Sequence, residues 1–274
     1  MRTDSPIGSS PGAIAIEEKG SGISDGSFSR GTLAIIGLGP GNRDQMTGRA
    51  LQAIEESDII VGYHTYLKLV EDLIAHKDVR ASGMRKEVDR AYLAVDLAIE
   101  GHKVAVISSG DPGVYGMAGV ILEAVQLRQA QEKVNVEVIP GVTSATAAAA
   151  ALGAPLMHDF AIISLSDLLT PWDLILRRVE NAATADFVIA LYNPKSTKRV
   201  HQIEEVQQLL LKHRPASTPV GIVRNARRAG EEKTVSTLGE FLNHDIDMFT
   251  VLIIGNSQTY TKDGWMITPR GYRW

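Results

Sequence analysis

The stretch LAIIGLGPGN, residues 33–42, decides the fold of this chain. Residues 33–36 form a short, continuous apolar run, which is typical of a strand buried on both faces. The glycines at positions 37, 39 and 41 then favour a tight turn, and we expect a helix at about residues 47–56. The stretch therefore predicts a strand, a glycine loop and a helix, which is the repeating unit of an α/β sheet.

The same alternation continues along the chain. We expect strands at 59–61, 103–107 and 134–139, and helices at 92–100, 116–126 and 143–152, the last of them ended by Gly153. Strands that alternate with helices imply a largely parallel sheet with both faces covered.

Beyond Pro155 the pattern is less regular. Strands are expected at 161–164, 187–191, 219–223 and 249–254, with Val235 as a candidate member, and a long helix at 197–213 ends before Pro215. This half therefore predicts a mixed sheet. The predicted fold is α/β with two α/β domains, an N-terminal domain of residues 31–155 and a C-terminal domain of residues 156–274.

Residues 1–30 differ from the rest of the chain. They contain seven Ser, five Gly and two Pro, and their one apolar patch is short, residues 13–16. Such a segment cannot bury enough apolar surface to offset its ordering entropy, so we expect a disordered tail. It lacks the basic start and long apolar run of a secretory signal.

The composition excludes several classes of function. Lys and Arg number 28 and Asp and Glu number 32, so the 274-residue chain has a net charge of −4. That balance argues against binding to nucleic acid or to a membrane surface, and the apolar runs are too short to cross a bilayer. The absence of cysteine excludes disulfides and zinc-thiolate sites, the seven histidines never fall in His-Glu-x-x-His spacing, and no metal site is predicted. We expect a cytoplasmic protein.

Three loops of the first half follow predicted strands. The loop at 37–42 has Asn42 where a dinucleotide fingerprint has its third glycine, and it lacks the Gly-Lys-Ser/Thr ending of a phosphate loop. The loops at 108–113 (SSGDPG) and 140–144 (PGVTS) lie beyond the carboxyl ends of strands, where open α/β sheets bind ligands. Thr143 is also a candidate cap of the helix that follows it.

Two loops of the second half also end strands. They read LYNP at 191–194 and RNARR at 224–228. The three arginines of the second loop are either a solvated basic turn or a clamp for carboxylates, because guanidinium matches a carboxylate bidentately.

Taken together, these loops, with VLIIG at 251–255, resemble the class III S-adenosylmethionine-dependent tetrapyrrole methylases over about residues 31–260. The resemblance implies two α/β domains with a cofactor cleft between them, a tetrapyrrole substrate and a homodimer. It implies S-adenosyl-L-methionine as cofactor and S-adenosyl-L-homocysteine as product. The positions that match the family's cofactor contacts are Pro40, Ser109, Gly110, Asp111, Val114, Thr143, Ser144, Asn193 and Ala226.

Within the family, the segments most similar to the corrin-type branch are YHTY at 63–66, SGMRKE at 82–87, YNP at 192–194 and IGNS at 254–257. This similarity implies methylation of precorrin-3B at carbon 17 with ring contraction, giving precorrin-4 in cobalamin biosynthesis. The alternatives are methylation of cobalt-factor III in the anaerobic pathway, another corrin-pathway methylase, a family member acting on RNA or on a protein histidine, and a tetrapyrrole carrier without activity.

The resemblance also suggests residues for the substrate side of the site. His64, Glu87 and Tyr115 are candidate acids or bases for ring contraction, because their segments resemble parts of the substrate cleft. Each also has a structural alternative, in which His64 caps a turn, Glu87 pairs with a neighbouring arginine and Tyr115 packs. A polyanionic substrate needs local positive charge, so the candidate substrate-binding residues are Arg85, Lys86 and Arg228.

Overall fold

The computed structural model describes residues 30–83 and 85–273. The predicted tail, residues 1–30, lies outside the described part of the chain except for Arg30, which forms an exposed ion pair with Glu132 at 3.1 Å.

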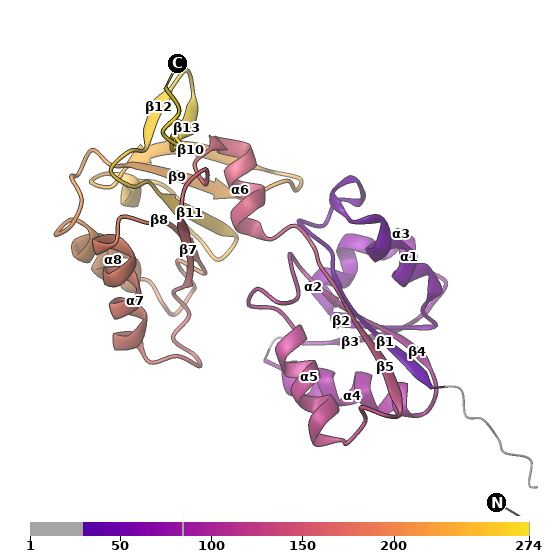
Figure 1. Ribbon diagram of the computed structural model, residues 1–274. Helices are drawn as coiled ribbons and strands as arrows, with labels where there is room; N and C mark the ends of the chain where they lie inside the picture. Colours follow the sequence, from indigo (N-terminus) through magenta and orange to yellow (C-terminus); the bar gives the residue numbers. More distant parts are fainter. Residues whose placement is uncertain (1–29, 84, 274) are drawn as a thin grey trace, which may run out of the picture.

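The first half forms a five-stranded parallel sheet in the order β3-β2-β4-β1-β5 (Figure 1). Its strands are β1 (Gly31–Gly37), β2 (Ile59–Tyr63), β3 (Asp78–Ser82), β4 (Lys103–Ser108) and β5 (Val134–Ile139). The helices are α1 (Gly48–Glu56), α2 (His64–Leu67), α3 (Glu71–Ile74), α4 (Glu87–Ile99) and α5 (Ala118–Leu127), with 3-10 turns at Arg43–Gln45 and Lys68–Val70.

Both faces of this sheet are covered, as a parallel sheet requires. Leu33 and Ile35 of β1 pack on α4 and α5, whereas the alternate residue Ile36 packs on the side of α1, α2 and α3. Side chains of a strand point alternately to the two faces, so β1 is buried on both of them. The continuous apolar run at 33–36 is the sequence signature of that position.

The second half forms a mixed five-stranded sheet in the order β10-β9-β11-β8-β7, in which only β7 and β8 are parallel. Its strands are β7 (Phe160–Ser164), β8 (Val188–Tyr192), β9 (Pro219–Arg224), β10 (Glu232–Thr237) and β11 (Thr250–Ile254). Helices α7 (Trp172–Thr184) and α8 (Gln202–Leu210) cover one face, and α6 (Ser144–Leu152) covers the other.

A small third sheet joins β12 (Tyr260–Lys262) and β13 (Trp265–Ile267) to the short strand β6 (Gly153–Ala154), and a 3-10 turn spans Phe241–Asn243. The α/β fold with a parallel and a mixed sheet is therefore confirmed. Val235 is a member of β10 as expected. Strand β3, helix α7 and the β12–β13 hairpin were not predicted; β3 is an edge strand with mostly exposed side chains, so it carries no apolar run.

The helix predicted at 197–213 was too long at both ends, since α8 spans Gln202–Leu210. The residues before it form a turn in which the Ser196 N–H donates to the Arg199 carbonyl at 3.0 Å, and the Arg199 side chain donates to the Asn193 carbonyl. These bonds replace the backbone bonds that a helix would make there.

Helix α6 packs its alanine face on the second sheet, against Ala190 of β8 and Ile253 of β11. The predicted division at residue 155 places this helix with the first half. The domain boundaries stay predictions, and the structure adds that the short side chains of α6 let it lie close to the strands of the second half.

The loops after β1, β4 and β5 meet through their backbones. Gly39 and Gly110 exchange two N–H···O bonds of 3.0 and 2.8 Å. A Cβ atom on Gly141 would lie 2.2 Å from the Gly110 carbonyl oxygen, and one on Gly37 would lie 2.7 Å from the same atom. Glycine is required at positions 37 and 141 because any side chain would push the loops apart.

We expect Gly141→Ala to destabilise the protein by about 3 kcal/mol, because backbone atoms of another loop must move to admit the methyl group. The matched control is Gly48→Ala at the start of α1, where a Cβ would meet no atom within 4 Å. Thermal denaturation should give a lower Tm for the first variant and an unchanged or slightly higher Tm for the second. Equal Tm values would contradict the backbone contact.

Candidate active site

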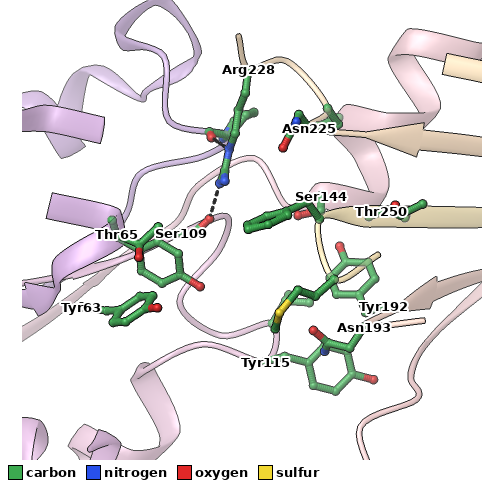
Figure 2. A pocket seen from close by; sticks show the side chains of 18 residues that line it. Tyr63, Thr65, Ser109, Tyr115, Ser144, Tyr192, Asn193, Asn225, Arg228 and Thr250 are labelled. Carbon is green, nitrogen blue, oxygen red and sulfur yellow. Dashed lines mark hydrogen bonds between the residues drawn. The ribbon is translucent and has the colours of Figure 1, made fainter. Parts of the chain in front are cut away.

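A cleft of about 260 Å³ lies between the two halves of the chain (Figure 2). One wall comes from the loops after β1 and β4 and from the region of β2 and α2. The other wall comes from α6, from the ends of β8 and β9, and from the segment at the start of β11. Strand ends of both sheets therefore meet at one place, as expected for ligand sites of α/β proteins.

Six of the nine predicted cofactor contacts line this cleft, namely Pro40, Ser109, Val114, Ser144, Asn193 and Ala226. The other three, Gly110, Asp111 and Thr143, belong to the same loops but do not line it. The backbone φ angle is +66° at Gly110 and +62° at its bonding partner Gly39, and a Cβ on Gly110 would lie 3.8 Å from the Thr143 Cα. The cleft is thus brought together from loops far apart in the sequence.

Asp111 holds the backbone behind the cleft. Its Oδ1 accepts the Gly113 N–H at 2.8 Å, and its Oδ2 accepts the Gly141 N–H at 3.1 Å. The first bond closes the turn after β4, and the second ties that turn to the loop after β5. Both oxygens of the carboxylate therefore have backbone partners.

Thr143 is the N-cap residue of α6, but its side chain makes no capping bond. Its Oγ1 lies 2.6 Å from the Tyr192 hydroxyl, which also accepts the Ala145 N–H at 2.6 Å. The helix is therefore capped by a tyrosine of β8 rather than by Thr143. Burial raises the pKa of the Tyr192 phenol above its ordinary value, so this group stays protonated near neutral pH.

Three residues that line the cleft have left-handed backbone conformations. Their φ angles are +53° at Tyr115, +51° at Asn193 and +50° at Asn225. Non-glycine residues seldom adopt positive φ, and such conformations persist only where the surrounding structure holds them. Their concentration around one cleft supports a functional role for it.

Arg228 carries the charge of the cleft. It is the one lining residue, among those that the structure describes, with a side chain charged at neutral pH. Its Nε donates to the Pro40 carbonyl, and its Nη2 donates to the Ser109 Oγ at 2.6 Å (Figure 2). Burial lowers the pKa of Arg228, and the guanidinium remains charged near neutral pH.

Polar contacts join the two halves around the cleft. Besides Arg228, the Asn42 Nδ2 donates to the Arg227 carbonyl at 2.8 Å. The Tyr115 hydroxyl donates to the Ile162 carbonyl and accepts the Ser164 N–H, both at 3.1 Å. Tyr115 thus fastens the loop after β4 to strand β7.

The remaining catalytic and substrate candidates lie outside the lining. His64 is exposed, with its Nδ1 3.4 Å from the Ser82 carbonyl oxygen and its ring 4.5 Å from that of Tyr63. Glu87 is the exposed first residue of α4. Lys86 pairs with Asp89 at 2.9 Å, and Arg85 is exposed with a φ of +62°. The structure does not bring these residues to the cleft wall.

Residues that the sequence did not single out as site residues also line the cleft. They are Tyr63, Thr65, Tyr66, Ala147, Tyr192, Asn225, Met248, Phe249, Thr250 and Val251. Six of them stand in segments already marked by the resemblance, namely Tyr63, Thr65, Tyr66, Tyr192, Asn225 and Val251. Met248 and Phe249 stand in no motif. Both are exposed apolar side chains, and only the fold shows that they face the cleft.

No helix among residues 30–83 and 85–273 is both long and apolar enough to span a bilayer. In the same part of the chain, no three side chains of His, Asp or Glu gather as metal ligands would.

The family of tetrapyrrole (corrin/porphyrin) methylases matches this chain over residues 32–242. Because the match covers well over half of the sequence, the chain belongs to the tetrapyrrole methylase family, which confirms the expected family.

Individual relatives share this assignment. The chain is 51% identical over 247 residues to the cobalt-factor III methyltransferase of Priestia megaterium, covering 89% of this chain and 46% of that protein. It is 44% identical over 249 residues to the precorrin-3B C(17)-methyltransferase of a Sinorhizobium species, covering 88% and 97%. The chain thus spans less than half the length of the first relative and nearly all of the second.

Among solved structures, the methyltransferase CobJ aligns with a TM-score of 0.83 at 36% identity, over 87% of this chain and 100% of that chain. The two-sheet arrangement is therefore that of a tetrapyrrole methyltransferase.

Asp247 fixes the segment that supplies Met248 and Phe249 to the cleft. Its carboxylate accepts the Phe249 N–H at 2.8 Å, the Thr250 hydroxyl at 2.9 Å and the Arg224 Nε at 2.8 Å. Partial burial opposes ionisation, but these hydrogen bonds outweigh it and hold the pKa of Asp247 below its ordinary value.

We expect Asp247→Asn to lower the Tm by a few degrees at pH 7. A depressed pKa contributes stability above the unfolded pKa of about 3.9, and this contribution is lost as the pH falls through the folded value. The Tm difference from wild type should therefore shrink below about pH 4. Asp245→Asn, at an exposed neighbour, is the control and should change little. An undiminished difference at pH 3 would refute the assignment.

Proposed function

We propose that this chain is an S-adenosylmethionine-dependent methyltransferase that methylates carbon 17 of a corrin-pathway tetrapyrrole. The observation that carries the proposal is the cleft between the two sheets, which gathers six of the nine residues that match the family's cofactor contacts. The name of the Sinorhizobium relative, precorrin-3B C(17)-methyltransferase, supports the reaction at carbon 17.

The residues of the cleft fit such a cofactor. Gly110 leaves open the space beside Thr143 and Ser144 that a side chain would fill. The hydroxyls of Ser109 and Ser144 line the cleft as neutral hydrogen-bonding groups. Apolar lining residues, among them Ala226 and Phe249, suit the flat adenine ring. Neutral polar groups next to apolar surface match a nucleoside joined to a sulfonium.

When bound, S-adenosylmethionine supplies an electrophilic methyl group. The part played by this chain is orientation, because holding two reactants in line is worth roughly 7–11 kcal/mol at best. The loops after β1, β4 and β5 would hold the nucleoside, and the loop after β8 would hold the methionine side through Asn193. No general base is needed for attack by an electron-rich carbon, which agrees with a lining that contains neutral tyrosines and no carboxylate among its described residues.

The substrate would occupy the side of the cleft nearest Tyr63, Tyr66 and Arg228. The rings of Tyr63 and Tyr66 meet edge to face with centroids 5.2 Å apart, and both line the cleft. Aromatic faces suit a flat macrocycle, and Arg228 suits one of its carboxylates. Arg85 and Lys86 are proposed to meet carboxylates at the rim, since both are exposed on the segment beside this wall.

Ring contraction requires proton transfer, for which His64, Glu87 and Tyr115 remain our candidates. Tyr115 is the one of the three that lines the cleft, and its hydroxyl is bonded to backbone groups of β7. It would have to exchange one of those bonds for the substrate. The homodimer and the cytoplasmic location also stay proposals drawn from the family resemblance.

Two substrates are candidates. Precorrin-3B, which would give precorrin-4, is the substrate that the sequence motifs imply. Cobalt-factor III is favoured by the higher identity, 51% against 44%, to the relative that carries its name. They differ in the presence of cobalt, so a single assay can separate them.

The test is incubation of the chain with methyl-labelled S-adenosylmethionine and each tetrapyrrole in turn, followed by mass spectrometry and NMR of the product. We expect one labelled methyl group on carbon 17 of one substrate. Calorimetry with S-adenosylhomocysteine is run alongside. A chain that binds tetrapyrrole but gives no heat with S-adenosylhomocysteine is a carrier, and methylation at another carbon would indicate a different enzyme of the pathway.

We expect Arg85→Ala and Arg228→Ala each to weaken substrate binding about ten- to a hundredfold. The reason is that a hydrogen bond to a charged partner is worth roughly 1.5–3 kcal/mol. S-adenosylhomocysteine affinity should stay within about twofold of wild type. Fluorescence quenching by substrate and calorimetry with S-adenosylhomocysteine measure the two effects.

The control for these variants is Arg177→Ala on the exposed side of α7, which should change neither affinity. Unchanged substrate binding in both test variants would mean that the arginines form a solvated surface. Equal losses of substrate and cofactor for Arg228→Ala would mean that it acts by joining Pro40 and Ser109 rather than by holding carboxylates.

A further inference from the structure

Asn193 is a strained residue at the cleft wall. It follows β8, precedes Pro194 and has a φ of +51°. Asparagine tolerates this conformation better than most residues, yet it still needs support from its surroundings. What supports Asn193 therefore sets the shape of this side of the cleft.

Two contacts fix Asn193 from opposite ends. Its side-chain Nδ2 donates to the Ser164 Oγ at 3.0 Å, which ties it to the end of β7. Its backbone carbonyl accepts a hydrogen bond from the Arg199 Nη2. Both contacts act on the residue itself rather than on a neighbour, so they restrain its position directly.

The Arg199 side chain that makes this contact is buried. The residue is 8% exposed and does not line the cleft. A turn closed by Ser196 brings it back beneath Asn193: the Arg199 N–H donates to the Ser196 Oγ at 3.1 Å, and the Ser196 N–H donates to the Arg199 carbonyl at 3.0 Å.

The charge and the N–H groups of Arg199 are only partly compensated by their surroundings. Its Nη1 lies 3.7 Å from the Asp167 Oδ1, and its Nε is buried with no hydrogen-bond partner among the described residues. Burying a guanidinium is costly unless its N–H groups are satisfied. A cation held there at a cost, with its strongest contact on a strained residue of the cleft, indicates a role beyond packing.

We propose that Arg199 is a positioning residue for the cofactor site, which holds Asn193 in its left-handed conformation through the Asn193 carbonyl. The inference rests on the proposed function and deepens it. Arg199 is buried and lies outside the cleft. Through Asn193 it would control how well the loop after β8 binds the methionine side of the cofactor.

The chain offers a matched control in Arg214. It is also a buried arginine, 5% exposed, and donates to the carbonyls of Gly255, at 2.6 Å, and Phe187. Its Nε also has no hydrogen-bond partner among the described residues, and it does not line the cleft. Loss of Arg214 therefore reproduces the loss of a buried guanidinium without touching Asn193.

The experiment compares wild type with Arg199→Met, Arg199→Lys and Arg214→Met in the full chain. S-adenosylhomocysteine binding is measured by calorimetry and stability by thermal denaturation. We expect the Kd to rise at least about tenfold in Arg199→Met and less in Arg199→Lys, which keeps a charged donor. Arg214→Met should lower the Tm and leave the Kd within about twofold. If Arg199→Met does not fold, the Kd of Arg199→Lys is compared with that of wild type instead.

A second arm tests whether Arg199 acts through Asn193. Glycine adopts positive φ without steric strain, so in an Asn193→Gly background the left-handed conformation no longer has to be held against strain. There the further change Arg199→Met should alter the Kd by no more than about twofold. This non-additivity is a result that a merely structural role would not produce.

Several results would overturn the inference. One is an Arg199→Met variant with a lowered Tm and a wild-type Kd; another is an equal loss of affinity in Arg214→Met. A tenfold effect that persists in the Asn193→Gly background would also overturn it. Wild-type protein that binds no S-adenosylhomocysteine would refute the proposed function and the inference with it, whereas the other results leave the proposed function standing.

Discussion

The close approach of three backbone loops is the constraint on which the rest of the structure depends. Gly37, Gly110 and Gly141 end up within van der Waals distance of one another because β1 lies between β4 and β5 in the parallel sheet. Parallel neighbours bring their carboxyl ends to one edge, so the loops that follow must share the same space. No side chain fits at Gly37 or Gly141, and Asp111 completes the junction with two hydrogen bonds.

The second half completes the site with polar contacts rather than with an apolar interface. Arg228 reaches Pro40 and Ser109, and Tyr115 reaches the backbone of β7. Directional bonds of this kind fix the distance between two walls and leave the space between them open. A continuous apolar contact would close the cleft, since it is stabilised by excluding all space between the surfaces.

The buried charges of the described chain are all carried by arginine. The buried charged residues of the described chain are Arg90, Arg199 and Arg214, and the guanidinium of each is bound mainly by carbonyl or hydroxyl oxygens. The planar guanidinium offers five donors and stays charged when buried, so it can gather several carbonyls of loops at once. Burial lowers the pKa of Arg90 and Arg214 without removing their charge near neutral pH. Arg228, in turn, gives the lining of the cleft a positive charge in spite of the chain's net charge of −4.

The sequence by itself determined the parallel sheet, the mixed sheet and the loops that carry the site. These features depend on local patterns, since a run such as 33–36 encodes burial on both faces and a glycine encodes a turn. The tertiary structure alone decided that Tyr192 caps α6, that α8 begins at Gln202, and that Met248 and Phe249 line the cleft. Each of these depends on a contact between segments far apart in the chain, and no local pattern encodes which distant backbone group a side chain will meet.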